Sequence, residues 1–250
     1  MTSGKPALPR ANPLKPTRNR RTLLITGASG GVGSAVARHA VAAGYRTALL
    51  ARGADKLAAI VDEVGPAAAV AVSADVTDWI AVSKAVDGVA ERLGGIDGAV
   101  INAGIALSAS FFGHGGADPD EWQSMVLTNV LGTALSARAV LPRLEESGGH
   151  LVIMGSVSGR IMRPGLYSAT KWAVSALAAS VRAEAVGTGV RVTVIQPGVI
   201  DTGILRDELR QRPMLDPDDV ARAVMFVLDQ PPTVDVNEIV LRPVGQPADC

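Results

Sequence analysis

Residues 22–33 read Thr-Leu-Leu-Ile-Thr-Gly-Ala-Ser-Gly-Gly-Val-Gly. The residues up to Thr26 are typical of a short strand, and helical periodicity begins directly after the last glycine. Glycine permits a tight turn, and it lets backbone N–H groups approach a pyrophosphate that the helix N-terminus then stabilises. We therefore predict a dinucleotide phosphate loop made by Gly27, Ser29, Gly30, Gly31, Val32 and Gly33. An ordinary strand-to-helix connection is the alternative, because the spacing differs from the usual G-x-G-x-x-G fingerprint.

The rest of the chain repeats this order of strand and helix. Short β-rich runs lie at 22–26, 46–50, 69–72, 98–101, 150–154, 191–195 and 237–241. Longer Ala-rich segments with helical periodicity lie between them, among them 34–43, 78–93, 120–144 and 167–186. This alternation predicts an α/β fold, a Rossmann-type doubly wound parallel sheet of about seven strands with helices on both faces. No break in composition divides residues 21–250, so we expect a single domain there.

Composition narrows the class of protein. The chain has 250 residues, of which 48% are hydrophobic and 3% aromatic, so a core of aliphatic residues is expected. Its net charge of zero gives no argument for nucleic acid as a partner. One cysteine and three scattered histidines argue against a disulfide or a metal site. No apolar stretch approaches the length of a membrane span, and the N-terminus lacks a signal-peptide core, so we expect a cytoplasmic protein without a membrane partner.

Residues 1–20 differ from the rest of the chain. They carry five basic residues, no acidic residue, and prolines at 6, 9, 13 and 16. Proline at this density prevents helix and sheet, so we interpret the segment as a disordered basic arm. It is either a free tail or an electrostatic tether to an acidic partner.

Two residues form a candidate acid–base pair. Tyr167 and Lys171 are four positions apart in a helical stretch, so their side chains project from one face. A free phenol is a poor acid–base catalyst at neutral pH, and a fixed ammonium nearby favours its phenolate form. Ser156 follows the run 150–154 and should face the same crevice, because sites in parallel sheets lie at the carboxyl ends of strands. Ser158 is a nearby alternative to Ser156.

Three motifs in order carry a family resemblance. They are Thr26-Gly27-x-x-x-Gly31-x-Gly33, then Asn102-Ala103-Gly104, then Tyr167-Ser168-Ala169-Thr170-Lys171. From about Arg21 to the C-terminus, the chain resembles the classical short-chain dehydrogenase/reductase family. The resemblance implies an oxidoreductase in which Tyr167 is the general acid/base and Lys171 also binds the nicotinamide ribose. It further implies that Ser156 binds the substrate carbonyl oxygen and that Asn129 supports a water-linked proton path to the lysine.

The end of the second strand bears on the choice of nicotinamide cofactor. A carboxylate there would bind the ribose hydroxyls of NAD, but none occurs before Asp55. Arg52 instead offers a guanidinium suited to a phosphate, and in the resembled family a basic residue here usually marks NADP(H). The family's other basic position holds Gly30, and a solvated surface role for Arg52 is the alternative. The resemblance implies further cofactor contacts from Asp75, Val76, Asn102, Ala103, Gly104, Pro197, Gly198, Ile200 and Thr202.

The expected partners are a small carbonyl or alcohol substrate and further copies of the chain. The resemblance implies a dimer or tetramer built on residues 121–144 and 167–186, and a substrate lid over 203–213 that reads equally well as an ordinary surface helix. Arg160 or Arg163 either pairs with a substrate carboxylate or is an exposed loop residue.

The C-terminal sequence bears on the substrate. It resembles the branch that acts on small 3-hydroxy acids and on biosynthetic aldehydes or ketones. Phe111, Phe112 and Trp122 line a substrate pocket or pack in the core or between subunits. A 3-oxoacyl thioester reductase and a non-enzymatic NADP(H)-binding redox sensor remain the competing interpretations.

Overall fold

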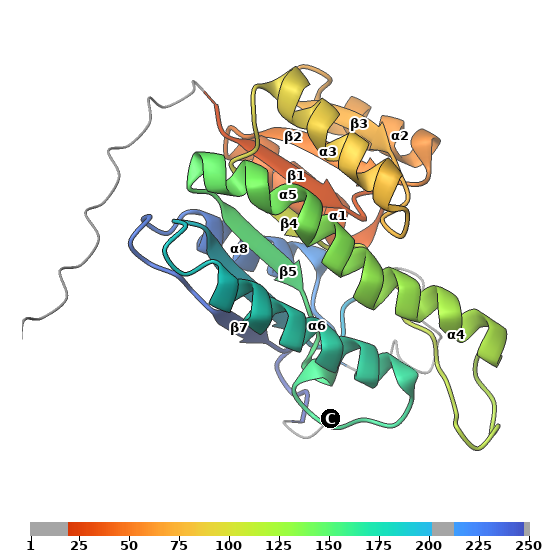
Figure 1. The fold of residues 1–250 in the computed structure, drawn as a ribbon. Coiled ribbons are helices and arrows are strands. Elements are labelled where there is room, and N and C mark those ends of the chain that lie inside the picture. The colour runs from red at the N-terminus through yellow and green to blue at the C-terminus, as the bar shows by residue number, and fades with distance from the viewer. Residues whose placement is uncertain (1–19, 202–212, 248–250) are drawn as a thin grey trace, which may run out of the picture.

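The computed structural model describes residues 20–201 and 213–247 and contains one parallel sheet of seven strands (Figure 1). The strand order is β3-β2-β1-β4-β5-β6-β7, and every neighbouring pair is parallel. The strands are β1 Thr22–Thr26, β2 Arg46–Ala51, β3 Ala69–Ser73, β4 Gly98–Ile101, β5 His150–Met154, β6 Arg191–Pro197 and β7 Glu238–Leu241. The predicted doubly wound α/β fold is confirmed.

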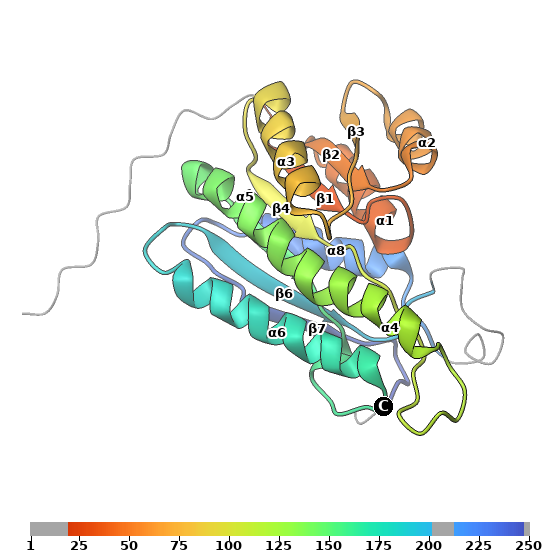
Figure 2. The ribbon, with the colours of Figure 1, turned by 45° about the vertical axis from the view of Figure 1, so that its right-hand side comes forward.

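Helices cover both faces of the sheet (Figure 2). They are α1 Gly31–Ala42, α2 Ala54–Val64, α3 Trp79–Leu93, α4 Pro119–Val126, α5 Thr133–Ser147, α6 Leu166–Glu184 and α8 Pro217–Leu228. One cluster of buried residues joins α1, α2 and α8 to the sheet, and a second joins α3, α5 and α6. Successive residues of β1 contribute to the two clusters in turn, because Leu23 and Ile25 belong to the first cluster and Leu24 to the second. Burial on both faces explains why the strands read as continuous apolar runs.

The helical segment predicted at 120–144 differs from an ordinary α-helix. A π-helical turn, Leu127–Gly132, joins α4 to α5, and the whole stretch Pro119–Ser147 has 29 residues. Among the described residues, this stretch alone is long and apolar enough to span a membrane by length and composition, contrary to the expectation that none approaches that length. Val140 and Leu144 of this stretch are fully buried in the core against the sheet. Of its most apolar part, 39% is buried.

Candidate active site

A cleft of about 710 Å³ opens at the carboxyl ends of β1, β2, β3 and β4. Its lining brings together all of the predicted cofactor contacts up to Gly104 except Gly33: Gly27, Ser29, Gly30, Gly31, Val32, Arg52, Asp75, Val76, Asn102, Ala103 and Gly104. Pro197 ends β6, and Gly198 and Ile200 follow it. None of the three lines this cleft, and Thr202 lies outside the described residues. Most of residues 1–20 and of the expected lid, 203–213, also lie outside them.

The phosphate loop packs closely on the segment after β4. Gly27 has a φ of 64°, and a Cβ there would lie 2.7 Å from the Cα of Ala103. A Cβ at Gly33 would collide with the carbonyl oxygen of Gly27. No side chain caps the N-terminus of α1, and its first turn contains no acidic residue. The loop therefore combines a tight turn with an uncapped helix N-terminus, a combination that suits a pyrophosphate.

Asn102 fixes this loop to β4. Its side-chain Nδ2 donates to the carbonyl oxygen of Gly27 at 3.1 Å, and its backbone N–H donates to Thr26 Oγ1 at 3.0 Å. The backbone N–H of Ala103 donates to the same hydroxyl at 3.2 Å. Three hydrogen bonds thus hold the two chain segments together at the floor of the cleft.

Basic side chains lie at the β2 end of the cleft. The guanidinium of Arg52 lies 3.9 Å from the carboxylate of Asp75, and the Arg52 side chain is 73% exposed. Hydrogen bonds from the backbone and side chain of Thr77 lower the pKa of Asp75, with a smaller contribution from Arg52. Such an exposed ion pair is weak, so the guanidinium can still bind another anion. Lys56, in the first turn of α2, also lines the cleft. Sequence reasoning missed Lys56, although a second basic residue shortly after Arg52 was a signal.

The candidate acid–base pair lies on α6 beside the end of β5. Lys171 is buried, its Nζ donates to the carbonyl oxygen of Met154 at 3.1 Å, and it lies 5.8 Å from the ring centroid of Tyr167. Ser156 is buried two residues after Met154. Its hydroxyl accepts from the backbone N–H of Ser158 at 3.1 Å and begins the 3-10 turn Val157–Gly159. The predicted Tyr167, Lys171 and Ser156 therefore gather at the carboxyl end of one strand.

Asn129 reaches the same place from the π-helical turn. Its Oδ1 accepts from the backbone N–H of Ile105 at 2.7 Å, and its Nδ2 donates to the Ile105 carbonyl at 2.8 Å and to Thr170 Oγ1 at 3.0 Å. A Cβ at Gly104 would lie 3.3 Å from Asn129 Oδ1 and 3.8 Å from Lys171 Nζ. Both groups therefore converge beside Gly104, which lines the cofactor cleft. A π-helical turn is rare, and where one occurs it frequently lies at a functional site, but sequence periodicity does not reveal it.

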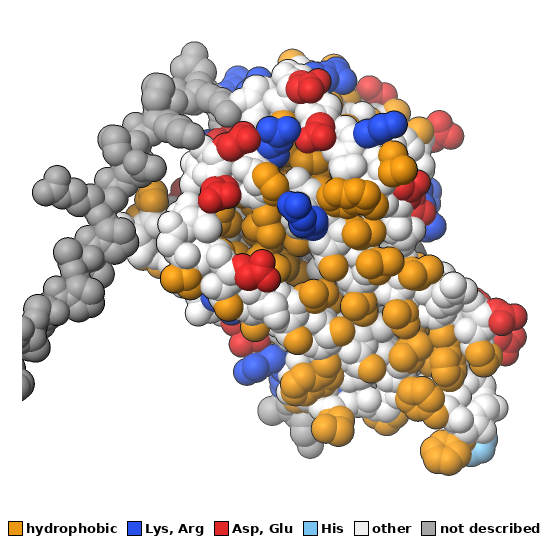
Figure 3. Space-filling model, in the orientation of Figure 1, with side chains coloured by type: hydrophobic (Ala, Val, Ile, Leu, Met, Phe, Trp, Pro, Cys, Tyr) orange, Lys and Arg blue, Asp and Glu red, His pale blue; other side chains and the backbone are white. Residues whose placement is uncertain are grey.

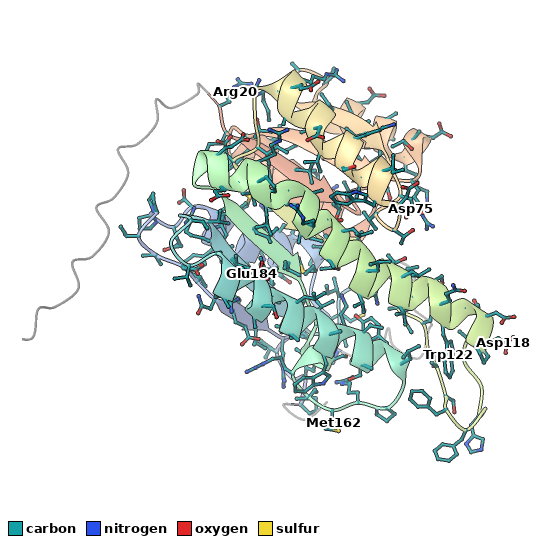
Figure 4. The ribbon with its side chains drawn as sticks, viewed as in Figure 1. Arg20, Asp75, Asp118, Trp122, Met162 and Glu184 are labelled. Atoms are coloured by element: carbon teal, nitrogen blue, oxygen red, sulfur yellow. The ribbon has the colours of Figure 1, made fainter. Side chains whose placement is uncertain are left out.

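The aromatic residues predicted to line a substrate pocket form a cluster outside the cofactor cleft. Phe111 packs edge-to-face on Trp122 with ring centroids 5.5 Å apart, and Trp122 Nε1 donates to the Ala117 carbonyl at 3.0 Å. Phe111 and Phe112 are exposed, so they do not pack in the core. Figure 4 shows Trp122 on α4 and Met162 on the loop after β5, both at the edge of the molecule that is distant from Asp75. None of these aromatic residues lines the cofactor cleft.

The two loop arginines have different surroundings. Arg160 Nε forms an ion pair with Glu238 at 3.2 Å. Arg163 Nε is buried and has no hydrogen-bond partner among the described residues. Arg163 is therefore the better candidate of the two for a substrate carboxylate.

Comparison with known proteins decides the family. The model of the short chain dehydrogenase family matches residues 21–213. The chain belongs to this family. Among curated relatives of this short-chain dehydrogenase, an uncharacterized oxidoreductase of Staphylococcus aureus (strain N315) is 37% identical over 225 residues, which cover 88% of this chain and 96% of the relative.

Two solved structures are similar to this short-chain dehydrogenase over most of its length. An alcohol dehydrogenase from Thermococcus sibiricus, complexed with 5-hydroxy-NADP, is 32% identical with a TM-score of 0.84 over 91% of this chain and 98% of that one. Serine dehydrogenase from Escherichia coli is 30% identical with a TM-score of 0.80 over 90% and 99% of the two chains. The protein is thus an oxidoreductase of a family that binds a nicotinamide cofactor and acts on small-molecule substrates. The cleft and the glycine cradle at Gly27 and Gly33 fit such a dinucleotide.

Proposed function

We propose that this short-chain dehydrogenase is an NADP(H)-dependent reductase of small ketones, aldehydes or 3-oxo acids. The observation that carries the proposal is the convergence of Lys171 Nζ and Asn129 Oδ1 beside Gly104, at the inner end of the cleft. A redox sensor needs the cleft but has no need of a buried ammonium and a buried amide next to an accessible tyrosine. The same set also serves a 3-oxoacyl thioester reductase, which remains the second candidate because its chemistry at the carbonyl is identical.

The phosphate preference rests on two basic residues. Arg52 and Lys56 both line the end of the cleft where a 2′-phosphate would lie, and the planar guanidinium suits that group. Related proteins have been solved with 5-hydroxy-NADP and with NADP+, and another with NADH. The proposed preference therefore depends on the side chains of this chain rather than on its relatives.

The residues of the chain would handle the proton while the cofactor handles the electrons. A reduced nicotinamide, when bound, supplies the hydride for the carbonyl carbon. Tyr167 donates a proton to the carbonyl oxygen, and Ser156 donates a hydrogen bond to that oxygen as negative charge develops on it. Lys171 favours the resulting phenolate, and Asn129 holds the backbone beside it. In the reverse direction Tyr167 accepts the proton of an alcohol, whose hydride the oxidised nicotinamide would take up.

The cofactor contacts follow the family pattern. The phosphate loop, Asp75, Val76 and the Asn102–Gly104 segment would hold the adenosine and pyrophosphate end. Tyr167, Lys171, Pro197, Gly198, Ile200 and Thr202 would hold the nicotinamide end.

We also propose that the protein is a cytoplasmic dimer or tetramer with residues 1–20 as a separate basic arm. Exposed apolar side chains on the helical face of α4–α6, namely Val126, Leu131 and Trp172, support an interface there. Hydrophobic side chains gather over these helices in Figure 3.

The test is NADPH consumption against a panel of ketones, aldehydes and 3-oxo acids. Tyr167→Phe removes one hydroxyl and should abolish turnover while leaving NADPH binding in place. Tyr45→Phe is the matched control, because Tyr45 is the only other tyrosine and lies in the core outside the cleft. Full turnover of Tyr167→Phe would contradict the mechanism. Three results would together favour the redox sensor. NADPH would bind without turnover, deletion of residues 1–20 would abolish binding to a partner, and Tyr167→Phe would leave both kinds of binding unchanged.

A further inference from the structure

Gln196 forms three hydrogen bonds behind the candidate active site. It lies on β6 between β5 and β7 and is completely buried. Its Oε1 accepts from the backbone N–H of Ser156 at 2.8 Å. Its Nε2 donates to Ser175 Oγ at 2.9 Å and to Glu238 Oε1 at 3.1 Å. The side chain therefore connects the segment after β5 with α6 and β7.

The partners of this amide fix its orientation. A backbone N–H can only donate, and a carboxylate can only accept. Exchanging the oxygen and nitrogen of Gln196 would set two donors against each other at Ser156 and two acceptors against each other at Glu238. In the observed orientation both N–H groups of the amide donate a hydrogen bond and its oxygen accepts one.

The glycine at position 155 makes room for the side chain of Gln196. A Cβ at Gly155 would collide with Gln196 Oε1, so the glycine before Ser156 permits this contact. The network also extends outward on both sides. Ser175 Oγ lies 3.1 Å from the carbonyl oxygens of Gly159 and Lys171, and Glu238 forms the ion pair with Arg160.

We propose that Gln196 is a positioning residue for the proposed reductase activity, on which this inference rests. Because it is completely buried, it does not touch substrate. It holds the backbone of Ser156 in place and connects it, through Ser175, to the helix that carries Lys171. Since displacement of a reacting group by about 1 Å can cost about 10²-fold in rate, loss of this contact should lower kcat.

The first test reverses the polarity of the contact between Gln196 and Glu238. Gln196→Glu sets two carboxylates against each other, so kcat should fall by about 10²-fold at neutral pH. Like charges raise the pKa of the pair, so a shared proton restores the hydrogen bond and the deficit should shrink as the pH falls. Adding Glu238→Gln supplies a new amide donor to the introduced carboxylate, and the double variant should recover kcat. The KM for NADPH should change little throughout.

Controls separate positioning from a general loss of folding. Gln230→Glu makes the same change at an exposed amide that bonds only to the Phe226 carbonyl in the described structure, and it should leave kcat unchanged. Gln196→Met removes the hydrogen bonds without adding a charge, and its kcat should fall equally at every pH. If Gln196→Glu does not fold, Gln196→Met with its flat pH profile replaces it.

An activity-independent measurement keeps the two proposals distinguishable. Hydrogen exchange of the Ser156 amide should be faster in Gln196→Met than in the wild type or Gln230→Glu. If the wild type turns over no carbonyl compound, the proposed function fails. The hydrogen-exchange result still tests whether Gln196 holds the backbone of Ser156. Unchanged kcat in folded Gln196→Met, or a double variant as slow as Gln196→Glu, would overturn the positioning role.

Discussion

The ammonium of Lys171 donates a hydrogen bond to the carbonyl oxygen of Met154 at 3.1 Å. This contact joins α6 to the end of β5, two residues before Ser156. Because the lysine is buried, solvent screens the interaction between its charge and the nearby Tyr167 only weakly. One side chain therefore both connects the two elements that carry the candidate catalytic residues and supplies the positive charge beside Tyr167.

Lys171→Met should lower kcat/KM by about 10²-fold or more, because both the charge and the contact with Met154 are lost. NADPH should also bind more weakly, since the lysine is proposed to hold the nicotinamide ribose. Lys84→Met, at an exposed position on α3, is the matched control and should behave as the wild type. Steady-state kinetics with a folding check by circular dichroism measures both, and equal activity of the two variants would refute the assignment.

Arg52→Asp should lower the preference for NADPH over NADH by about tenfold or more, because a carboxylate replaces a charged donor to the phosphate. Lys56→Ser should have a smaller effect in the same direction. The ratio of kcat/KM for the two cofactors measures both changes. An unchanged ratio in Arg52→Asp would show that this guanidinium is only a surface group.

Gly33→Ala should weaken both folding and dinucleotide binding, since the added Cβ collides with backbone in the phosphate loop. Gly88→Ala, within α3, meets no atom within 4 Å and should stabilise the protein by up to about 1 kcal/mol. Thermal unfolding with and without NADPH compares the two. A Gly33→Ala variant with normal Tm and normal NADPH-induced stabilisation would contradict the close packing.

The free energy of unfolding should decrease as the pH falls, because His150 is kept neutral in the folded protein. Burial, and to a smaller extent the charge of Arg191, lowers the pKa of His150 to about 3. Thr193 Oγ1 donates to the Val236 carbonyl, so His150 Nε2 carries the proton and donates to Thr193 at 2.8 Å. In the unfolded chain this histidine binds a proton below pH ~6.5, whereas in the folded protein it stays neutral at that pH. The stabilisation is therefore complete above that pH and is lost as the pH falls towards 3, by up to about 1.4 kcal/mol per pH unit.

His150→Gln removes this titration and should flatten the dependence between about pH 6.5 and about pH 5. Urea unfolding at several pH values measures it. The same slope in both proteins would assign the acid sensitivity to other groups.

Arg163→Met should raise the KM for 3-oxo acids and leave that for the corresponding methyl esters unchanged, since only the acids offer a carboxylate to the guanidinium. Each acid and its ester form a matched pair on the same enzyme. An equal change for both would show that Arg163 shapes the loop without binding the substrate charge.

Local sequence predicted most of the fold. The strands β1, β4 and β5 have the predicted bounds, and the other strands differ by one or two residues at an end. Helical spacing also set Tyr167 and Lys171 on one face of α6. These features depend on the backbone geometry of a few consecutive residues, which periodicity and glycine spacing express directly.

Tertiary structure alone decided the contacts between distant residues. The register of β5, β6 and β7 brings Gln196 to Ser156 and Glu238, and the same register gives Arg160 an ion-pair partner. The π-helical turn that directs Asn129 to Ile105 and Thr170 likewise leaves no periodic signal. Local residue order is thus enough to define the helices and strands and the residues at their ends. Which of those residues meet depends on how the sheet packs, because hydrogen bonds across strands depend on register and distance rather than on neighbouring residues.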